Sequence, residues 1–210
     1  ITRKEIHSQT VESKMLDDKI GYIAVSSFEE VTKQQFRDAL EKLEKEGERS
    51  LIIDLRNNGG GLLSTAVDML DRLLPKGTLV YTMDKKGEKE VYSSTDKEHF
   101  DKPVAILVNE NSASASEVFS GAMQDYKKAV LVGTTTFGKG SVQTAFDLPD
   151  GTALKLTTSK YYTPKGRNIH GTVLDPDIPV KLNDTTYTQK KSGLTIDNQL
   201  EGAVEYLMKK

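Results

Sequence analysis

The 210-residue chain contains no cysteine and only three histidines, His7, His99 and His170. The absence of cysteine excludes a disulfide scaffold, a thiolate metal site and a cysteine nucleophile. The histidines are spread along the chain in polar surroundings, so we expect no zinc site and little support for a histidine general base. Any hydrolytic chemistry is therefore expected to use other side chains.

The chain also lacks a large excess of charge and a long apolar run. Its 29 Lys and Arg residues nearly balance 31 Asp and Glu residues, which gives a formal net charge of -2. This balance argues against electrostatic binding to nucleic acid or to a membrane surface. No apolar run approaches the roughly 18 residues that cross a bilayer, so we expect no integral membrane segment. The length suggests one large domain, or one domain with an appendage, and the 36% of hydrophobic residues is enough to form its apolar core.

Alternating strand and helix patterns predict an α/β fold with a mostly parallel sheet. Apolar runs typical of strands alternate with segments that have apolar residues at helical spacing. The strands are predicted at 21–28, 51–55, 104–108 and 129–132. One helix is predicted to begin after Thr32, which would be its N-cap, and two more are predicted at 62–74 and 114–126. This order is typical of right-handed crossovers between parallel strands.

Further elements are predicted around this unit. Residues 1–16 are interpreted as an edge strand or a linker, and two short strands are predicted near 79–83 and 90–93. Strands near 142–148 and 153–162 are expected to form an antiparallel or mixed extension. A final helix is predicted at 198–208.

A glycine-rich loop, Asn57 to Gly61, follows the predicted strand 51–55 and opens a helix. Consecutive glycines allow the backbone to approach a ligand closely, and N–H groups at a helix start favour negative charge. The loop could hold a phosphate or the oxyanion of an acyl transfer. A tight turn without a ligand is the alternative, and the spacing matches neither common nucleotide-binding motif.

A serine-rich loop, Ser112 to Glu117, lies between the next strand and helix. Small residues there could present a hydroxyl at a helix N-terminus, as in a nucleophile elbow. Ser112 and Ser116 are equally plausible as helix caps without a catalytic role.

Lys139 lies between two glycines in a third loop, beside apolar Phe137 and Val142. If the amine is drawn inward, desolvation would lower its pKa, and a neutral lysine can accept the proton of a serine. The ordinary interpretation is a lysine in a solvated turn.

Taken together, the three loops resemble the C-terminal processing (tail-specific) serine peptidases. The similar segments are 54–61, 112–117 and 138–143, with further similarity at 21–23, 162–166 and 176–178. The resemblance is strongest to Bacillus-type members, which include a sporulation signalling protease. It implies a crotonase/ClpP-like α/β core with a mixed, mostly parallel central sheet flanked by helices.

The resemblance also implies the catalytic residues. It matches Ser114 to the nucleophile, Lys139 to the base and Gln143 to the glutamine that orients the lysine. The backbone N–H groups of Gly60 and Ala115 would form the oxyanion hole, with Gly60 preferred to Gly61. No metal or organic cofactor is expected for this chemistry.

The chain departs from the family pattern in two ways. Gly59 stands where the family commonly has proline, and no PDZ domain precedes the core. We expect an N-terminal strand or linker over 1–19, a protease core over 20–183 and a C-terminal tail and helix over 184–210.

The resemblance implies a polypeptide substrate with an exposed C-terminal tail, an extracytoplasmic location and a PDZ module in the full-length family member. We also expect a homodimer, with residues 1–16 and 198–210 as candidate contact segments, and no nucleic-acid partner. Two alternatives stay open: a catalytically silent peptide-binding core whose dyad is misaligned, and an enzyme acting on an acyl or phospho ligand. The second would leave Lys139 and Gln143 unexplained.

Overall fold

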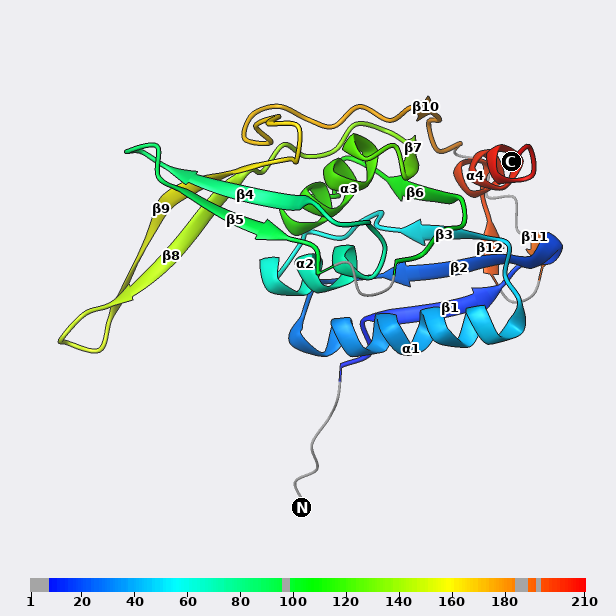
Figure 1. Cartoon of the computed structure of the whole chain (residues 1–210), viewed down its shortest axis with the longest axis horizontal. Helices are drawn as coiled ribbons and strands as arrows, with labels where there is room; N and C mark the ends of the chain where they lie inside the picture. Colours follow the sequence, from blue (N-terminus) through cyan, green and yellow to red (C-terminus); the bar gives the residue numbers. More distant parts are fainter. Residues whose placement is uncertain (1–7, 96–98, 184–188, 192–193) are drawn as a thin grey trace, which may run out of the picture.

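The computed structural model describes residues 8–95, 99–183, 189–191 and 194–210. Its central sheet contains, in spatial order, β1 (Val11–Met15), β2 (Ile20–Val25), β3 (Ser50–Asp54), β6 (Val104–Val108), β7 (Ala129–Gly133) and β10 (Ile178–Pro179) (Figure 1). Strand β1 is antiparallel to β2, whereas all other neighbours are parallel. The prediction of a mostly parallel sheet is confirmed, and part of the N-terminal segment is an edge strand.

Three helices connect the parallel strands and pack on one face of this sheet: α1 (Glu30–Glu46), α2 (Leu63–Asp71) and α3 (Ala115–Asp125). Side chains alternate along a strand, so Ile23, Ile53 and Ile106 all face these helices. The resulting layer is a continuous apolar core. The predicted order of strands and helices is therefore confirmed.

The start of α1 differs from the prediction in one detail. Its N-cap is Glu29 rather than Thr32, which lies three residues further on. The Thr32 hydroxyl accepts the Glu29 N–H at 2.9 Å and donates to the Ser27 carbonyl at 3.0 Å. A threonine at the third helical position can thus complete a capping box, and the helix begins three residues, nearly one turn, earlier than Thr32 suggested.

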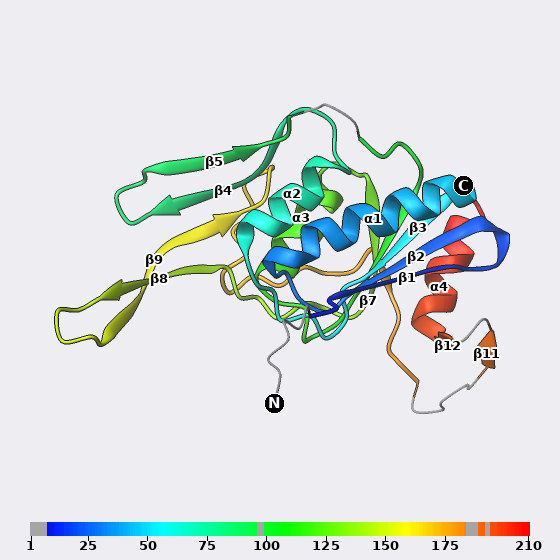
Figure 2. The same ribbon diagram turned by 90° about the horizontal axis from the view of Figure 1, so that it is seen from below.

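The predicted C-terminal helix is α4 (Asn198–Leu207), and it lies apart from the other three helices (Figures 1 and 2). It packs on the opposite face of the central sheet, where Leu200, Ala203 and Leu207 contact strand residues such as Tyr22 and Leu107. This packing makes residues 198–207 a layer of the fold. Because its apolar face is buried within the chain, that face is closed to the dimer contact that the sequence suggested.

A second, four-stranded sheet extends away from the core (Figures 1 and 2). It contains, in spatial order, β5 (Lys89–Ser93), β4 (Thr78–Asp84), β9 (Ala153–Tyr162) and β8 (Ser141–Asp147), all antiparallel. The predicted extension is therefore a separate sheet that also recruits β4 and β5. Two short strands that the sequence did not indicate, β11 (Gln189–Lys191) and β12 (Leu194–Ile196), pair with each other.

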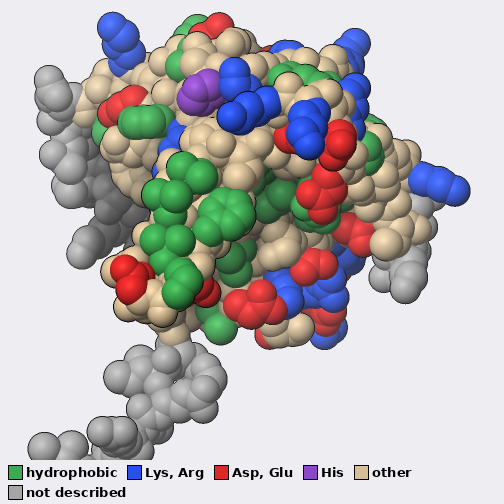
Figure 3. Space-filling view, turned by 90° about the vertical axis from the view of Figure 1, so that its left-hand side faces the viewer, with side chains coloured by type: hydrophobic (Ala, Val, Ile, Leu, Met, Phe, Trp, Pro, Cys, Tyr) green, Lys and Arg blue, Asp and Glu red, His purple; other side chains and the backbone are tan. Residues whose placement is uncertain are grey.

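The β8–β9 hairpin carries exposed apolar side chains. Phe146 pairs with Leu154 across the hairpin, and Leu148 and Leu156 are exposed nearby. Figure 3, which views the molecule from the side of this sheet, shows hydrophobic side chains gathered on it. The hairpin thus presents apolar surface to its surroundings instead of burying it in the core.

Candidate active site

Three loops follow adjacent strands at their carboxyl ends. Residues 55–61 follow β3, residues 109–114 follow β6 and residues 134–140 follow β7. Adjacent parallel strands end at the same edge of a sheet, where ligands usually bind in open α/β folds. Direct hydrogen bonds join the loops, because the Ala113 N–H donates to the Asn58 carbonyl and the Phe137 N–H donates to the Ser112 carbonyl, both at 3.1 Å. The glycine, serine and lysine loops singled out in the sequence therefore meet.

Ser114 occupies a strained turn between β6 and α3. Its backbone angles are φ 57° and ψ -114°, outside the regions that residues with a side chain prefer. A sharp strand-to-helix turn of this kind presents a hydroxyl at the start of a helix, as in a nucleophile elbow. Ser114 is half-buried, and its hydroxyl donates no hydrogen bond within the described part of the chain. That hydroxyl is available for chemistry.

The two other serines of the loop have structural roles. Ser112 is fully buried and its hydroxyl donates to the Leu55 carbonyl at 2.7 Å. Ser116 is also fully buried, and its hydroxyl donates to the Asn58 carbonyl at 2.8 Å. Both hydroxyls therefore fix the glycine loop against the serine loop, which leaves Ser114 as the exposed candidate of the three.

Gly60 lies directly against the Ser114 turn. Its φ is +101°, and an added Cβ would stand 2.7 Å from the Ala113 carbonyl oxygen and 2.9 Å from the Ser114 Cβ. Only glycine fits there. The Gly60 N–H donates to Asn58 Oδ1 at 2.9 Å, and its part in an oxyanion hole stays a prediction. The N–H of Ala115, in the first turn of α3, has no acceptor among the described residues.

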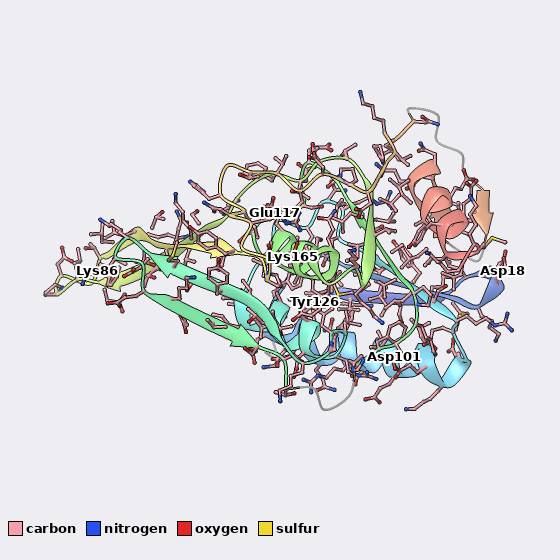
Figure 4. All side chains as sticks on the ribbon, turned by 45° about the horizontal axis from the view of Figure 1, so that its top comes forward. Asp18, Lys86, Asp101, Glu117, Tyr126 and Lys165 are labelled. Carbon is pink, nitrogen blue, oxygen red and sulfur yellow. The ribbon has the colours of Figure 1, made fainter. Side chains whose placement is uncertain are left out.

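Glu117 connects the serine loop to the lysine loop. Its side chain is fully buried, and its carboxylate accepts the N–H groups of Ser114 at 2.9 Å, Gly138 at 2.6 Å and Lys139 at 2.8 Å. Figure 4 labels Glu117 on α3, in the interior of the molecule. The sequence interpretation assigned this residue no role. The signal was the Ser-x-x-Glu spacing of a capping box at the start of a helix.

Lys139 and Gln143 lie near this junction but point outward. Both residues are exposed, and among the described residues neither side chain forms a hydrogen bond or an ion pair. The exposed Lys139 side chain agrees with the ordinary interpretation of a lysine in a solvated turn. Its role as the base stays a prediction.

Two histidines can be placed. An added Cβ on Gly140 would stand 2.1 Å from the His170 backbone nitrogen, so the main chain at His170 lies against the lysine loop. His170 is therefore nearer to the proposed site than its position in the sequence suggested. Its side chain is exposed. His99 lies 2.9 Å from Asp101, and His7 is outside the described residues.

A polar network lies beside the glycine loop. The Arg56 guanidinium donates to both Asp54 oxygens and, at 2.7 Å, to Asp197 at the start of α4, and the Tyr22 hydroxyl donates to Asp54 at 2.8 Å. Burial acts to lower the pKa of Arg56, but the bonds to Asp54 and the charge of Asp197 outweigh it and raise that pKa. Burial, reinforced by Asp54, also raises the pKa of Tyr22. Arg56 stays charged and Tyr22 stays neutral, so this network is structural.

A cavity next to this network has a volume of about 540 Å³. Arg56, Asn109, Glu110 and Thr134 are among its lining residues, whereas Ser114 and Lys139 do not line it. In the described part of the chain, no group of three or more acidic or histidine side chains could hold a metal ion. No helix formed by those residues is long and apolar enough to cross a membrane.

Comparison with known proteins places this site in a family. The family model of peptidase family S41 matches residues 19–180. The chain belongs to peptidase family S41. A "Probable CtpA-like serine protease" of Staphylococcus aureus (strain COL) is 44% identical to the chain over 183 residues, and the Staphylococcus haemolyticus protein of the same description is 45% identical over the same length.

Solved structures agree with this S41 assignment. The photosystem II D1 C-terminal processing protease superposes with a TM-score of 0.77 and 32% identity, covering 86% of this chain and 50% of that protein. The tricorn protease, at 22% identity and a TM-score of 0.60, covers 91% of this chain and 18% of that protein and shares the fold. The aligned segment covers 86% of this chain but only 37% of the length of each staphylococcal relative. The S41 core is therefore the part of those longer proteins that this chain represents.

Proposed function

We propose that the chain is the catalytic core of a serine endopeptidase that cleaves polypeptides at or near unstructured C-terminal tails. The observation that carries this proposal is Ser114, which lies in a strained turn at the start of α3, where its hydroxyl donates no hydrogen bond and the neighbouring Ala115 N–H has no acceptor among the described residues. Membership of family S41 supports the reaction type. The name of the similar D1 C-terminal processing protease supports a substrate cut near its C-terminus.

Acylation would begin when the Ser114 oxygen attacks the scissile carbonyl and the neutral Lys139 amine takes the serine proton. Gln143 would orient that amine. The tetrahedral oxyanion would be stabilised by the Ala115 N–H and a glycine N–H of the loop, worth about 3 kcal/mol per donor. For Gly60 to be that donor, it must exchange its bond to Asn58 for one to the oxyanion.

Collapse of this intermediate breaks the peptide C–N bond, and Lys139 returns the proton to the leaving amine. Water then attacks the acyl-enzyme, Lys139 accepts a proton from it, and Ser114 regains its hydroxyl hydrogen as the new carboxylate leaves. Every proton is accounted for by Lys139 and water, so the reaction requires no metal or cofactor.

An extended substrate would bind along the site through main-chain hydrogen bonds. The exposed apolar surface that includes Phe137, which is 62% exposed, would contact apolar side chains of the substrate. We further propose an extracytoplasmic location, a homodimer, a signalling role and a PDZ module in the full-length protein. These follow from the resemblance to C-terminal processing peptidases.

A specific observation favours a second candidate, a peptide-binding core that does not cleave. Lys139 and Gln143 are both exposed and make no side-chain contact with Ser114 among the described residues. A dyad that stays open would bind a tail without hydrolysing it. The two candidate functions differ in whether the Lys139 side chain closes onto Ser114 when a tail is bound.

The deciding experiment incubates the chain with an unstructured peptide tail, with and without an added PDZ module. The wild type and the Ser114→Ala and Lys139→Ala variants are compared by mass spectrometry of the products. Cleavage by the wild type that both substitutions abolish supports the endopeptidase. Binding of the tail by the wild type without cleavage, under both conditions, supports the silent core.

A further inference from the structure

Glu117 contacts the main chain at both proposed catalytic positions. Its Oε2 accepts the N–H of Ser114 at 2.9 Å and that of Lys139 at 2.8 Å. Since both bonds meet at one oxygen, the two amide nitrogens lie within about 6 Å of each other. A single buried atom therefore sets the spacing between the turn that carries the serine and the loop that carries the lysine.

The second oxygen of Glu117 holds the lysine loop from the other side. Oε1 accepts the Thr136 hydroxyl at 2.7 Å and the Gly138 N–H at 2.6 Å. Thr136 is itself buried and accepts the Leu174 N–H at 2.9 Å. The carboxylate thus restrains three positions of residues 136–139, a segment that Gly138, with a φ of +87°, would otherwise leave free to move.

All four partners of the Glu117 carboxylate are donors. A carboxylate that accepts at both oxygens is the ionised form. The residue is fully buried, and no lysine, arginine or histidine of the described chain forms an ion pair with it. A buried charge held by three main-chain N–H groups and one hydroxyl fixes the geometry of those groups, because any displacement leaves a donor unsatisfied.

We propose that Glu117 is a positioning residue that aligns Lys139 with Ser114 by binding the backbone of both. It touches neither substrate nor the reacting atoms. The inference rests on the proposed function, because alignment matters only if these two residues act together. It explains how an exposed lysine can serve the site: the main chain is fixed at the required place while the long side chain remains free to turn toward Ser114.

Glu117→Gln tests this proposal with little change of volume. An amide has one acceptor oxygen, so it can satisfy either the Ser114 and Lys139 pair or the Thr136 and Gly138 pair. The NH₂ group would then face at least one main-chain N–H, donor against donor, because among the four partners only the Thr136 hydroxyl can turn to accept. The matched control is Glu48→Gln, because Glu48 is also buried but pairs with Lys102 at 2.6 Å before β3, at the opposite edge of the sheet.

Kinetics on a peptide tail give the first measurement. Misalignment of reacting groups by about 1 Å costs about 100-fold in rate, so we expect kcat of Glu117→Gln to fall by about 100-fold with little change in KM. Glu48→Gln should keep the kcat of the wild type at a temperature where all variants are folded. A kcat for Glu117→Gln equal to that of Glu48→Gln would overturn the proposal.

Amide hydrogen exchange gives a second measurement that does not depend on activity. We expect exchange in Glu117→Gln to accelerate in residues 112–116 or 136–140, and to stay unchanged in β2 and β3. Unchanged exchange in both loops would overturn the proposed anchoring. If the loops respond but the wild type never cleaves a peptide, the anchoring role stands and the endopeptidase proposal fails.

Discussion

Replacement of Arg56 by methionine tests whether the network at the start of the glycine loop holds the fold together. The guanidinium bonds to Asp54 at 2.7 Å and to Asp197 at 2.7 Å, and the three side chains are 14%, 9% and 25% exposed. Methionine has a similar length but leaves two carboxylates without their cation. Removing one partner of a buried pair costs 3–5 kcal/mol, and the partly exposed Asp197 favours a value of about 3 kcal/mol here.

Urea unfolding followed by circular dichroism measures this loss. With an m-value on the order of 2 kcal/mol/M, the midpoint of Arg56→Met should fall by about 1.5 M. Arg37→Met is the matched control, because Arg37 pairs with Asp68 at 3.8 Å and both side chains are about half exposed. Such a surface pair contributes less than about 1 kcal/mol. Equal shifts for the two variants would refute the structural role given to Arg56.

Two further predictions concern the site itself. Gly60→Ala should abolish peptide cleavage and destabilise the chain by about 1–3 kcal/mol. The added Cβ would stand 2.9 Å from the Ser114 Cβ, on a residue with a positive φ that disfavours any side chain. A variant with normal activity and a normal melting temperature would contradict this. Ser116→Ala should cost about 0.5–1.5 kcal/mol in thermal unfolding, because the Asn58 carbonyl loses the Ser116 hydroxyl and keeps only the Ala113 N–H as a donor; an unchanged melting temperature would contradict the structural role of Ser116.

The sequence predicted the parallel sheet well because its strands are short apolar runs bounded by loops. Leu51 to Leu55 and Val104 to Val108 are buried on both faces, and such runs have few alternatives to a central strand. It predicted the second sheet less well. The pairing of β4 with β9 joins residues about 80 positions apart, which local patterns do not encode.

The site was predicted in its parts but not in its connections. The three loops meet because β3, β6 and β7 are adjacent, and the serine, lysine and glycine loops were all identified. The sequence could not indicate that the Gly60 N–H donates to Asn58 Oδ1, and it left open whether the Lys139 side chain is drawn inward or lies in solvent. Glu117 was missed because a glutamate in the first turn of a helix is ordinarily a cap, and only the tertiary structure reveals its long-range bonds.

Trapping of the acyl-enzyme tests the central claim most directly. The chain is mixed with an activated peptide ester, quenched in acid within milliseconds to seconds, and digested for mass spectrometry of the peptide that contains residues 112–117. The account predicts an acyl group on Ser114 in the wild type, none on Ser112 or Ser116, and none in Lys139→Ala. An adduct on another residue, or hydrolysis that persists in Ser114→Ala, would contradict it.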